Sequence, residues 1–192
     1  MAKAPQKNTA GKSLVTLKVT LRGTRPPIWR RLRIPGSLTL GALHEAIQAA
    51  MGWHGGHLHA FDIDGRQYGD RQIVDDVADE NRLTLNGLMR SGSDRFAYTY
   101  DFGDNWEHAV TIEKNEPVGD DAASPVCIAG KRNCPPEDCG GVWGYANILE
   151  ILADKSHPEH AEQIDLLGED FDPEAFSIDT ANRILAARFR RK

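Results

Sequence analysis

Apolar residues at every second position constrain this chain more than any other feature. In Ser13–Gly23 the residues Val15, Leu17, Val19 and Leu21 alternate with polar ones. Alternation of this kind, over aliphatic and β-branched side chains, predicts a strand with one buried face. The alternation returns in four later segments: Ile28–Pro35, His57–Asp64, Phe96–Phe102 and Trp106–Ile112. The sequence therefore predicts a sheet of about five strands.

Turn residues predict how these strands are joined. Pro26 and Pro27 interrupt the first run, and the second begins at once, which indicates a hairpin. Gly103-Asp104-Asn105 separates two runs rich in aromatic residues and indicates a second hairpin. The connection from the first hairpin to the third strand is long enough for a parallel pairing.

One segment between the strands has helical spacing. Leu40, Leu43 and Ile47 recur at intervals of three and four residues, Ser37 or Thr39 can cap the start, and Gly52 can end the helix. We expect this helix to cross the sheet.

The last third of the chain differs from the rest in its residue composition and in its expected elements. Cys127–Gly144 is rich in Gly, Pro and Cys and is expected to be an ordered loop. Asp70–Asn81 is expected to be a loop as well, followed by a short element at 83–89. Helices are predicted at Tyr145–Ala153, at Pro158–Leu167 and from Ser177 or Asp179 to about Phe189.

These elements predict an α+β fold: a β-grasp-like mixed sheet of about five strands crossed by one main helix, with a helical C-terminal extension. We expect a disordered tail at residues 1–12 and a single domain at 13–192. Within that domain, 13–114 would hold the sheet and main helix, and 115–192 the loop and C-terminal helices.

Composition narrows the function classes. The chain has 192 residues and a net charge of −5, which argues against a general polyanion binder. It has no apolar run of membrane-spanning length, no secretory leader and an odd number of cysteines, three, so a cytoplasmic protein with reduced thiols is expected. The charge is uneven, because Lys12–Arg33 holds seven basic residues and no acidic one. Arg30, Arg31 and Arg33 could therefore contact an anion.

The histidine and carboxylate side chains are the best candidates for metal binding or acid–base catalysis. His57 and His59 share one face of the third predicted strand, and Asp101, Asp104 and His108 flank the second hairpin turn. Imidazole with carboxylate suits Zn, Mn, Fe or Ni, so a divalent metal is a possible cofactor. The same groups could instead serve acid–base catalysis, or the histidines could be hydrogen-bonded core residues.

Two other patterns are weaker indications of function. Cys127, Cys134 and Cys139 lack the Cys-x-x-Cys spacing of a zinc knuckle and are expected to be partly buried thiols in a loop. Gly140–Gly144 lacks the Gly-Lys-Ser/Thr of a phosphate-binding loop, so its glycines are interpreted as a tight turn.

Several strings occur together and in order along the chain. They are Pro27–Arg31, Leu40–Trp53, His57–Phe61, Tyr98–His108, Cys134–Gly141, Gly144-Tyr145 and Phe171–Phe176. In these strings the chain resembles the bacterial and archaeal plasmid pRiA ORF-three-like family, which is also labelled as a TnpR-like passenger protein of an insertion element. The resemblance extends from about Leu14 to Leu185. It implies an accessory protein of mobile genetic elements with no known activity.

The TnpR label would imply a site-specific resolvase, which the residues do not support. A resolvase needs a helix-turn-helix that reads DNA, and the only basic helical stretch is Arg188–Lys192 at the C-terminus.

The matched strings suggest one functional cluster on the sheet. It would comprise His57, His59, Tyr100, Asp101, Asp104, Trp106, His108, Glu137 and Asp138. Three functions follow. The favoured one is a non-enzymatic binding or adaptor module for an unknown protein or small ligand. The alternatives are a metal-dependent hydrolase or nuclease using the histidines and aspartates, and a nucleic-acid binder using the basic N-terminal hairpin. No catalytic residue is assigned.

Overall fold

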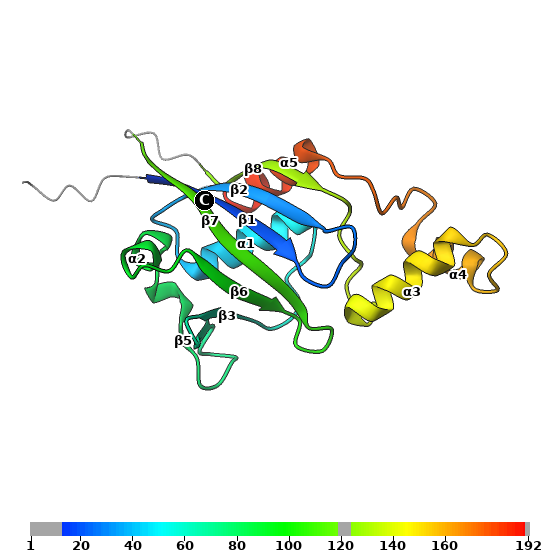
Figure 1. The fold of residues 1–192 in the computed structure, drawn as a ribbon, viewed down its shortest axis with the longest axis horizontal. Coiled ribbons are helices and arrows are strands. Elements are labelled where there is room, and N and C mark those ends of the chain that lie inside the picture. The colour runs from blue at the N-terminus through cyan, green and yellow to red at the C-terminus, as the bar shows by residue number, and fades with distance from the viewer. Residues whose placement is uncertain (1–12, 119–123, 191–192) are drawn as a thin grey trace, which may run out of the picture.

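A sheet of eight strands forms one layer of the protein, and helices cover one of its faces (Figure 1). The structure is a computed structural model and describes residues 13–118 and 124–190. The predicted tail at 1–12 and part of the acidic segment after Glu116 lie outside these residues. Across the sheet the order is β5-β4-β3-β6-β7-β1-β2-β8. The strands are β1 (Ser13–Leu21), β2 (Trp29–Pro35), β3 (His59–Ile63), β4 (Arg66–Gly69), β5 (Ala78–Asp79), β6 (Arg95–Tyr100), β7 (Trp106–Pro117) and β8 (Val126–Lys131).

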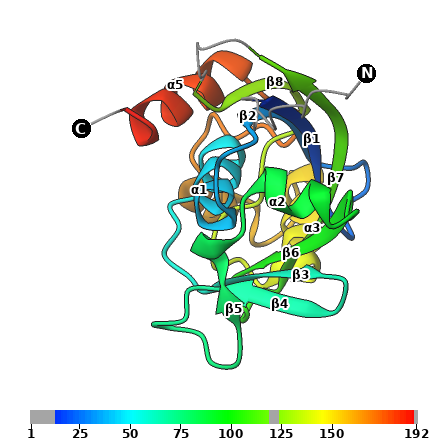
Figure 2. The same cartoon turned by 90° about the vertical axis from the view of Figure 1, so that its left-hand side faces the viewer.

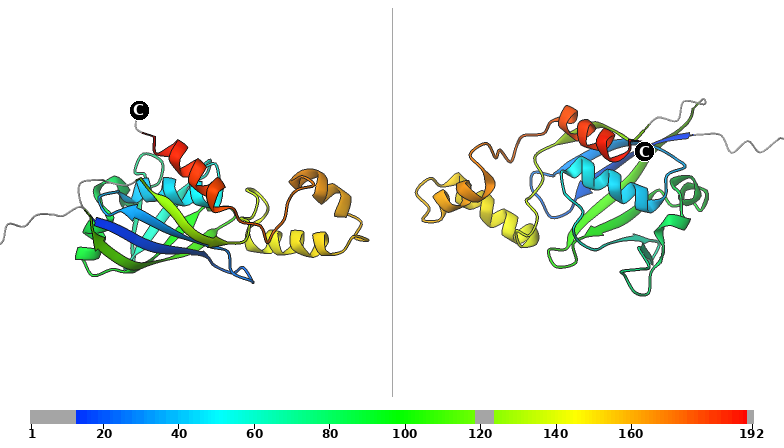
Figure 3. Two further views of the ribbon diagram at one scale, coloured as in Figure 1. Left: turned by 90° about the horizontal axis from the view of Figure 1, so that it is seen from above. Right: turned by 180° about the vertical axis from the view of Figure 1, so that it is seen from behind.

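The helices lie in two groups. The main helix α1 and the C-terminal helix α5 lie on the same face of the sheet, whereas α3 and α4 project beyond one end of it (Figure 3). The helices are α1 (Leu40–Met51), the 3-10 turn η1 (Glu80–Arg82), α2 (Leu85–Arg90), α3 (Gly141–Ala153), α4 (His160–Leu167) and α5 (Ile178–Arg188). Among the described residues, no helix has the length and apolar character needed to cross a membrane.

The core lies between the sheet and α1. The inward face of the strands carries Leu17, Leu32, Phe61 and Tyr98, all fully buried. The sheet curves around α1, which fills the concave side (Figure 2). Burying apolar side chains of both elements against each other is the main stabilising contribution to such a two-layer fold.

The ends of α1 confirm the predicted helix. The Thr39 hydroxyl accepts a hydrogen bond from the Ala42 amide at 3.2 Å and caps the first turn. Gly52 ends the helix with φ at +94°, a left-handed conformation that glycine adopts without steric cost.

The prediction of about five strands was too low, because the sheet has eight. The five expected strands are present, but β4 and β5 are too short to show a period, and β8 was predicted as loop. The bulge between Arg31 and Leu32 in the β2–β8 pairing breaks the alternation that would have identified β8. The three C-terminal helices were predicted correctly, although α3 starts four residues earlier, at Gly141.

A β-grasp arrangement is not found. The two hairpins join through an antiparallel pairing of β1 with β7, in which Val19 lies opposite Val110. The predicted third strand, β3, pairs with β4 and β6, again antiparallel. The parallel pairing in the sheet is instead between the short strands β4 and β5.

The open edge of β8 is closed by a side chain of α5. The Asn182 amide oxygen accepts from the Cys127 backbone N–H at 2.7 Å, and its amide nitrogen donates to the Cys127 carbonyl at 2.9 Å. Asn182 thus satisfies the two backbone groups that a neighbouring strand would otherwise pair with. Unpaired strand edges promote association with other chains, so this contact protects the edge.

Replacing Asn182 by Ala should leave both Cys127 backbone groups without a partner. We expect a loss of about 1–3 kcal/mol in the free energy of unfolding, measured in urea, together with a concentration-dependent shift to larger species in light scattering. Asn147→Ala, an exposed asparagine in α3, is the matched control. If the two variants behave alike, the edge contact has no protective role.

Two buried histidines have lowered pKa values and therefore make the folded state less stable as the pH falls. Burial lowers the pKa of His108 from 6.5 to about 4. Burial, with the nearby His59 and Arg188, lowers the pKa of His44 to about 3. Between these values and 6.5 the unfolded chain binds more protons than the folded one, so stability falls as the pH decreases.

We therefore expect the free energy of unfolding to decline steadily from about pH 6.5 to pH 4, with His108 contributing on the order of 3 kcal/mol. His108→Gln should flatten this decline, whatever its stability at pH 7. His160→Gln, in α4, should leave the slope unchanged. Urea unfolding across this pH range tests the expectation, and an unchanged slope in His108→Gln would contradict it.

Candidate functional site

Three segments from distant parts of the chain meet at one end of the sheet. They are residues 53–58 between α1 and β3, the turn 101–105 between β6 and β7, and the loop 133–140 between β8 and α3. Figure 1 shows the β6–β7 turn beside the start of α3. We call this place the sheet-end site.

Asp101 is held in one orientation within the turn. Its backbone lies in the left-handed region with φ at +55°, and its side chain is 10% exposed. Oδ1 accepts from the backbone N–H groups of Gly103 at 2.9 Å and Asp104 at 3.4 Å. Oδ2 points toward His57, whose Nδ1 lies 3.7 Å away. The turn therefore uses one carboxylate oxygen and presents the other to the site.

Two glycines at the start of α3 allow close backbone contacts, Gly141 with the turn and Gly144 with the loop that precedes the helix. A Cβ on Gly141 would lie 2.3 Å from the Asp104 carbonyl oxygen, and one on Gly144 would lie 1.8 Å from the Cys139 carbonyl oxygen. The Gly140 N–H also donates to the Asp104 carboxylate at 3.2 Å. These contacts place the loop, and Asp138 with it, against the hairpin turn.

His57 lies between two carboxylates. Its Nε2 is 3.3 Å from Asp138 Oδ1, whereas its Nδ1 is the nitrogen near Asp101. Asp138, like Asp101, has a left-handed backbone, with φ at +57°. Non-glycine residues in this conformation carry a steric cost and concentrate at functional sites. One ligand atom from each of the three residues lies within 4.8 Å of the others, a spacing that could hold a metal ion.

A second set of polar contacts fastens the same loop. Glu137 Oε1 accepts from the Tyr100 hydroxyl at 2.5 Å, and Oε2 lies 2.9 Å from His54 Nδ1. Burial raises the pKa of Glu137, but the hydrogen bonds from Tyr100 and His54 together outweigh burial and lower it. Burial and the Glu137 carboxylate raise the pKa of Tyr100 well above its ordinary value, so its hydroxyl remains a donor.

Aromatic rings connect the contacts of Glu137 to His57. The Tyr100 ring meets the His57 ring edge to face at a centroid distance of 5.8 Å and stacks on Trp53 at 5.2 Å. The Trp53 indole N–H donates to the Pro135 carbonyl at 3.0 Å. Rigid neighbours of this kind restrict how a ligand residue can move.

Five of the nine residues predicted for a common cluster meet at the sheet-end site: His57, Tyr100, Asp101, Glu137 and Asp138. Asp104 lies at its edge and binds the Gly140 backbone. Trp106 and His108 lie in the core, fully buried, and His108 Nδ1 faces the Tyr98 carbonyl at 3.2 Å. Of the five predicted metal ligands, His57 and Asp101 belong to the three-residue group; His59, Asp104 and His108 do not.

His59 belongs to a separate buried group. Its ring stacks on His44 with centroids 3.6 Å apart, and its Nε2 lies 2.8 Å from Glu80 Oε2. His44 Nδ1 in turn lies 2.7 Å from the Tyr98 hydroxyl. Although His57 and His59 are two residues apart, β3 begins only at His59, so the shared strand face expected for them does not exist.

Sequence reasoning missed Trp53 and His54, and did not include Asp138 among the metal ligands. His54 opens the His54-x-x-His57-x-His59 run, which was a usable signal. Asp138 offered none, because only the docking of loop 133–140 brings it to His57.

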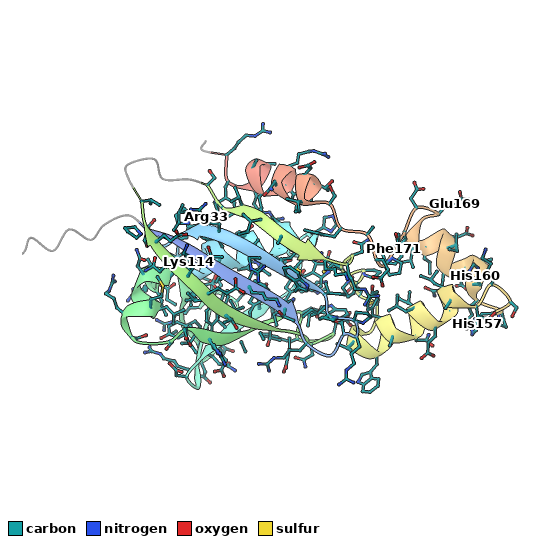
Figure 4. All side chains as sticks on the ribbon, turned by 45° about the horizontal axis from the view of Figure 1, so that its top comes forward. Arg33, Lys114, His157, His160, Glu169 and Phe171 are labelled. Carbon is teal, nitrogen blue, oxygen red and sulfur yellow. The ribbon has the colours of Figure 1, made fainter. Side chains whose placement is uncertain are left out.

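Ion pairs within the fold neutralise much of the positive charge of the basic N-terminal hairpin. Arg31 donates two hydrogen bonds to Glu113, at 2.7 and 2.9 Å, and Arg33 lies 3.8 Å from Glu116. Figure 4 shows Arg33 and Lys114, both paired with Glu116, at the same end of the sheet. Arg30 is 2% exposed and donates to the carbonyls of Ala50, Trp29 and Lys131. These contacts lend no support to the predicted anion contact.

The cysteines are not activated. All three are free thiols, and Cys127 lies in β8 rather than in a loop. Burial raises the pKa of Cys134 to about 12 and that of Cys139 to about 11. Nucleophilic attack needs a thiolate, so neither thiol is suited to it at neutral pH.

The remaining histidines lie far from the site. Figure 4 places His157 and His160 at the connection between α3 and α4, beyond the end of the sheet.

Comparison with known proteins places the chain in a family. Residues 13–180 match the model of the family described as plasmid pRiA4b ORF-3-like protein. The uncharacterized protein y4hQ of Sinorhizobium fredii is 40% identical over 188 residues, which cover 94% of this chain and 96% of that protein. The crystal structure of MM3350 from Methanosarcina mazei Go1, a protein of unknown function, superposes with a TM-score of 0.81 at 39% identity and covers 88% of this chain and 98% of that one. The chain belongs to the plasmid pRiA4b ORF-3-like protein family.

Proposed function

We propose that this protein is a binding module whose sheet-end site takes a divalent transition-metal ion. The observation that carries the proposal is the convergence of His57, Asp101 and Asp138 from three separate segments, with ligand atoms within 4.8 Å of one another. One imidazole and two carboxylates suit zinc, manganese or iron.

The surroundings support this assignment. Asp101 and Asp138 both have a left-handed backbone conformation. The hydrogen bonds within the turn occupy one Asp101 oxygen and leave the other directed at His57. The loop that carries Asp138 is clamped by Glu137 and by the Gly141 contact. A site with a second shell of this kind orients its ligands before the ion arrives.

Two simpler explanations compete with a metal. A protonated His57 could form an ion pair with both aspartates, since its two nitrogens face different carboxylates. The aspartates could also bind a cationic group of a partner protein. Only the metal explanation requires a stoichiometric ion that depends on the three side chains.

The test uses the chelator-treated chain titrated with Zn²⁺ or Mn²⁺ in a calorimeter. We expect one ion per chain, and we expect Asp138→Asn or Asp101→Asn to weaken binding by at least about tenfold, because losing a ligand costs no less than losing an outer-shell partner. Asparagine tolerates a left-handed backbone and keeps the hydrogen bonds of the turn, so these variants should fold.

Asp76→Asn is the matched control, because Asp76 is exposed and has a left-handed backbone with φ at +58° away from the site. It should bind the ion like the parent chain. Absence of metal binding by the parent, or equal weakening in all three variants, would contradict the proposal.

A second candidate is a metal-dependent hydrolase. It is favoured by the small number of protein ligands, since three leave coordination positions for a water molecule. Glu137, between Tyr100 and His54, would be the neighbouring group available for proton transfer. An accessory role in mobile elements is compatible with either candidate and remains a prediction.

Activity separates the two candidates. If the site is hydrolytic, the metal-loaded chain should cleave an activated phosphodiester or ester, and Asp138→Asn and Glu137→Gln should each reduce the rate by about 10²-fold or more. Asp76→Asn should retain it. Binding of the metal without turnover of either substrate class would favour the binding module.

A further inference from the structure

A cavity of about 370 Å³ lies between the end of α1 and the start of α5. The two helices lie side by side over the same face of the sheet (Figure 3). Most of the side chains that line the cavity are apolar, among them Met51, Phe176 and Ile184. Cavities of this size, with apolar walls and a few polar groups, are typical of sites for small molecules. We call this space the α1–α5 cavity.

Arg30 is the one charged side chain in the described lining of this cavity, and it is 2% exposed. Its Nε donates to the Ala50 carbonyl at 2.8 Å, and Nη1 donates to the carbonyls of Trp29 and Lys131, each at 3.0 Å. Its Nη2 has no hydrogen-bond partner in the described part of the chain. Nη2 is not among the fully enclosed atoms that lack a partner, so it retains accessible surface, and the space that Arg30 lines is the α1–α5 cavity.

This buried guanidinium has no carboxylate partner among the residues that the structure describes. Burial lowers the pKa of Arg30, and the acidic groups that raise it are the thiols of Cys134 and Cys127. Burial raises the pKa of both thiols, so they are uncharged at neutral pH. A buried cation without an anionic partner is costly, because it has lost its hydration. The cavity is therefore the place where a counterion would stabilise Arg30.

Phe176 fixes the orientation of the guanidinium. Its ring centroid lies 4.0 Å from the Arg30 guanidinium carbon. A Cβ on Gly130 would lie 2.5 Å from the Phe176 ring and 3.0 Å from Arg30 Cδ, so a glycine in β8 lets the ring and the arginine stem pack together. The ring covers one face of the guanidinium, whereas its hydrogen bonds are made in the plane of the group, so the Nη2 edge remains available to a ligand.

The start of α5 adds polar groups that favour an anion. Ser177 caps the helix by accepting from the Thr180 amide at 3.1 Å, so the Ser177 hydroxyl proton is free to be donated elsewhere. The N-terminus of a helix also favours negative charge. The end of α1, on the other wall, has the opposite polarity, but its Ala50 carbonyl is occupied by Arg30.

We propose that the α1–α5 cavity binds a small organic carboxylate with an apolar body. A single cationic group fits a single negative charge, and the apolar walls fit a hydrocarbon body. Arg30 Nη2 would donate to the carboxylate, with the hydroxyls of Ser177 and Thr180 as further donors. This contact lies inside the fold, not on the exposed face of the N-terminal hairpin. The cavity shares no residue with the three candidate metal ligands, so the proposal does not depend on metal binding.

Calorimetric titration of the full chain with benzoate and with hexanoate tests this inference, because the two acids carry one carboxylate on an aromatic or an aliphatic body. We expect one site per chain for at least one of them. The neutral counterpart of that ligand, benzamide or hexanamide, should bind at least about tenfold more weakly, since it lacks the charge that Arg30 would pair with. Equal binding of acid and amide, or no binding of either acid at millimolar concentration, would overturn the proposal.

Variants locate the site. Arg30→Lys should weaken binding by about tenfold or more, because an ammonium lacks the planar fork that reaches the carbonyls and the ligand together. Ala175→Trp fills the cavity from an exposed position without altering Arg30, and should weaken binding even if Arg30→Lys does not fold. Ala186→Trp is the matched control, since Ala186 is an exposed residue of α5 that does not line the cavity.

Thermal unfolding without ligand verifies that each variant folds. Parent-like binding by Ala186→Trp together with weak binding by Ala175→Trp supports the cavity as the site. Parent-like binding by Ala175→Trp, or equal weakening in both tryptophan variants, would show that the carboxylate does not bind in the cavity.

Discussion

The antiparallel pairing of β1 with β7 holds the whole fold together. The β1–β2 and β6–β7 hairpins are each encoded locally, but they lie some distance apart in the chain and become one sheet only where Val19 meets Val110. A slip of one residue would turn every core side chain of β1 outward. Because α1 packs across both halves of the joined sheet, its buried face also depends on this register.

The pairing of β6 with β7 positions the candidate metal ligands. Once β6 and β7 are in register, the turn that carries Asp101 is presented at one end of the sheet, and the loop before α3 closes against it. Gly141 allows the two backbones to meet, while the Glu137 contacts with Tyr100 and His54 hold the loop from the other side. A substitution that enlarges Gly141 would therefore displace Asp138 without touching any ligand residue.

Charge segregation along the chain produces ion pairs within the fold. The basic residues of β2 lie beside the acidic residues of β7, with β1 between them, so Arg31 and Glu113 neutralise each other on the uncovered face of the sheet. Such exposed pairs contribute little stability. Arg30 has the opposite role: it points into the core, where backbone carbonyls receive its donors and its guanidinium lies 4.0 Å from the centroid of the Phe176 ring.

The sequence by itself determined the local elements and the family. The period of two in β1 and β7, the spacing and caps of α1, and the Gly-Asp-Asn turn specify structure through neighbouring residues alone. Tertiary structure decided the strand order, the existence of β8 and the membership of the site. In the sequence, His59 and His108 were as good candidates for the site as His57. In the structure, the start of β3 and the inward face of β7 bury both side chains away from the sheet-end site. Asp138 reaches His57 because Gly141 lets the start of α3 touch the backbone of Asp104, and a contact of that range leaves no local pattern in the sequence.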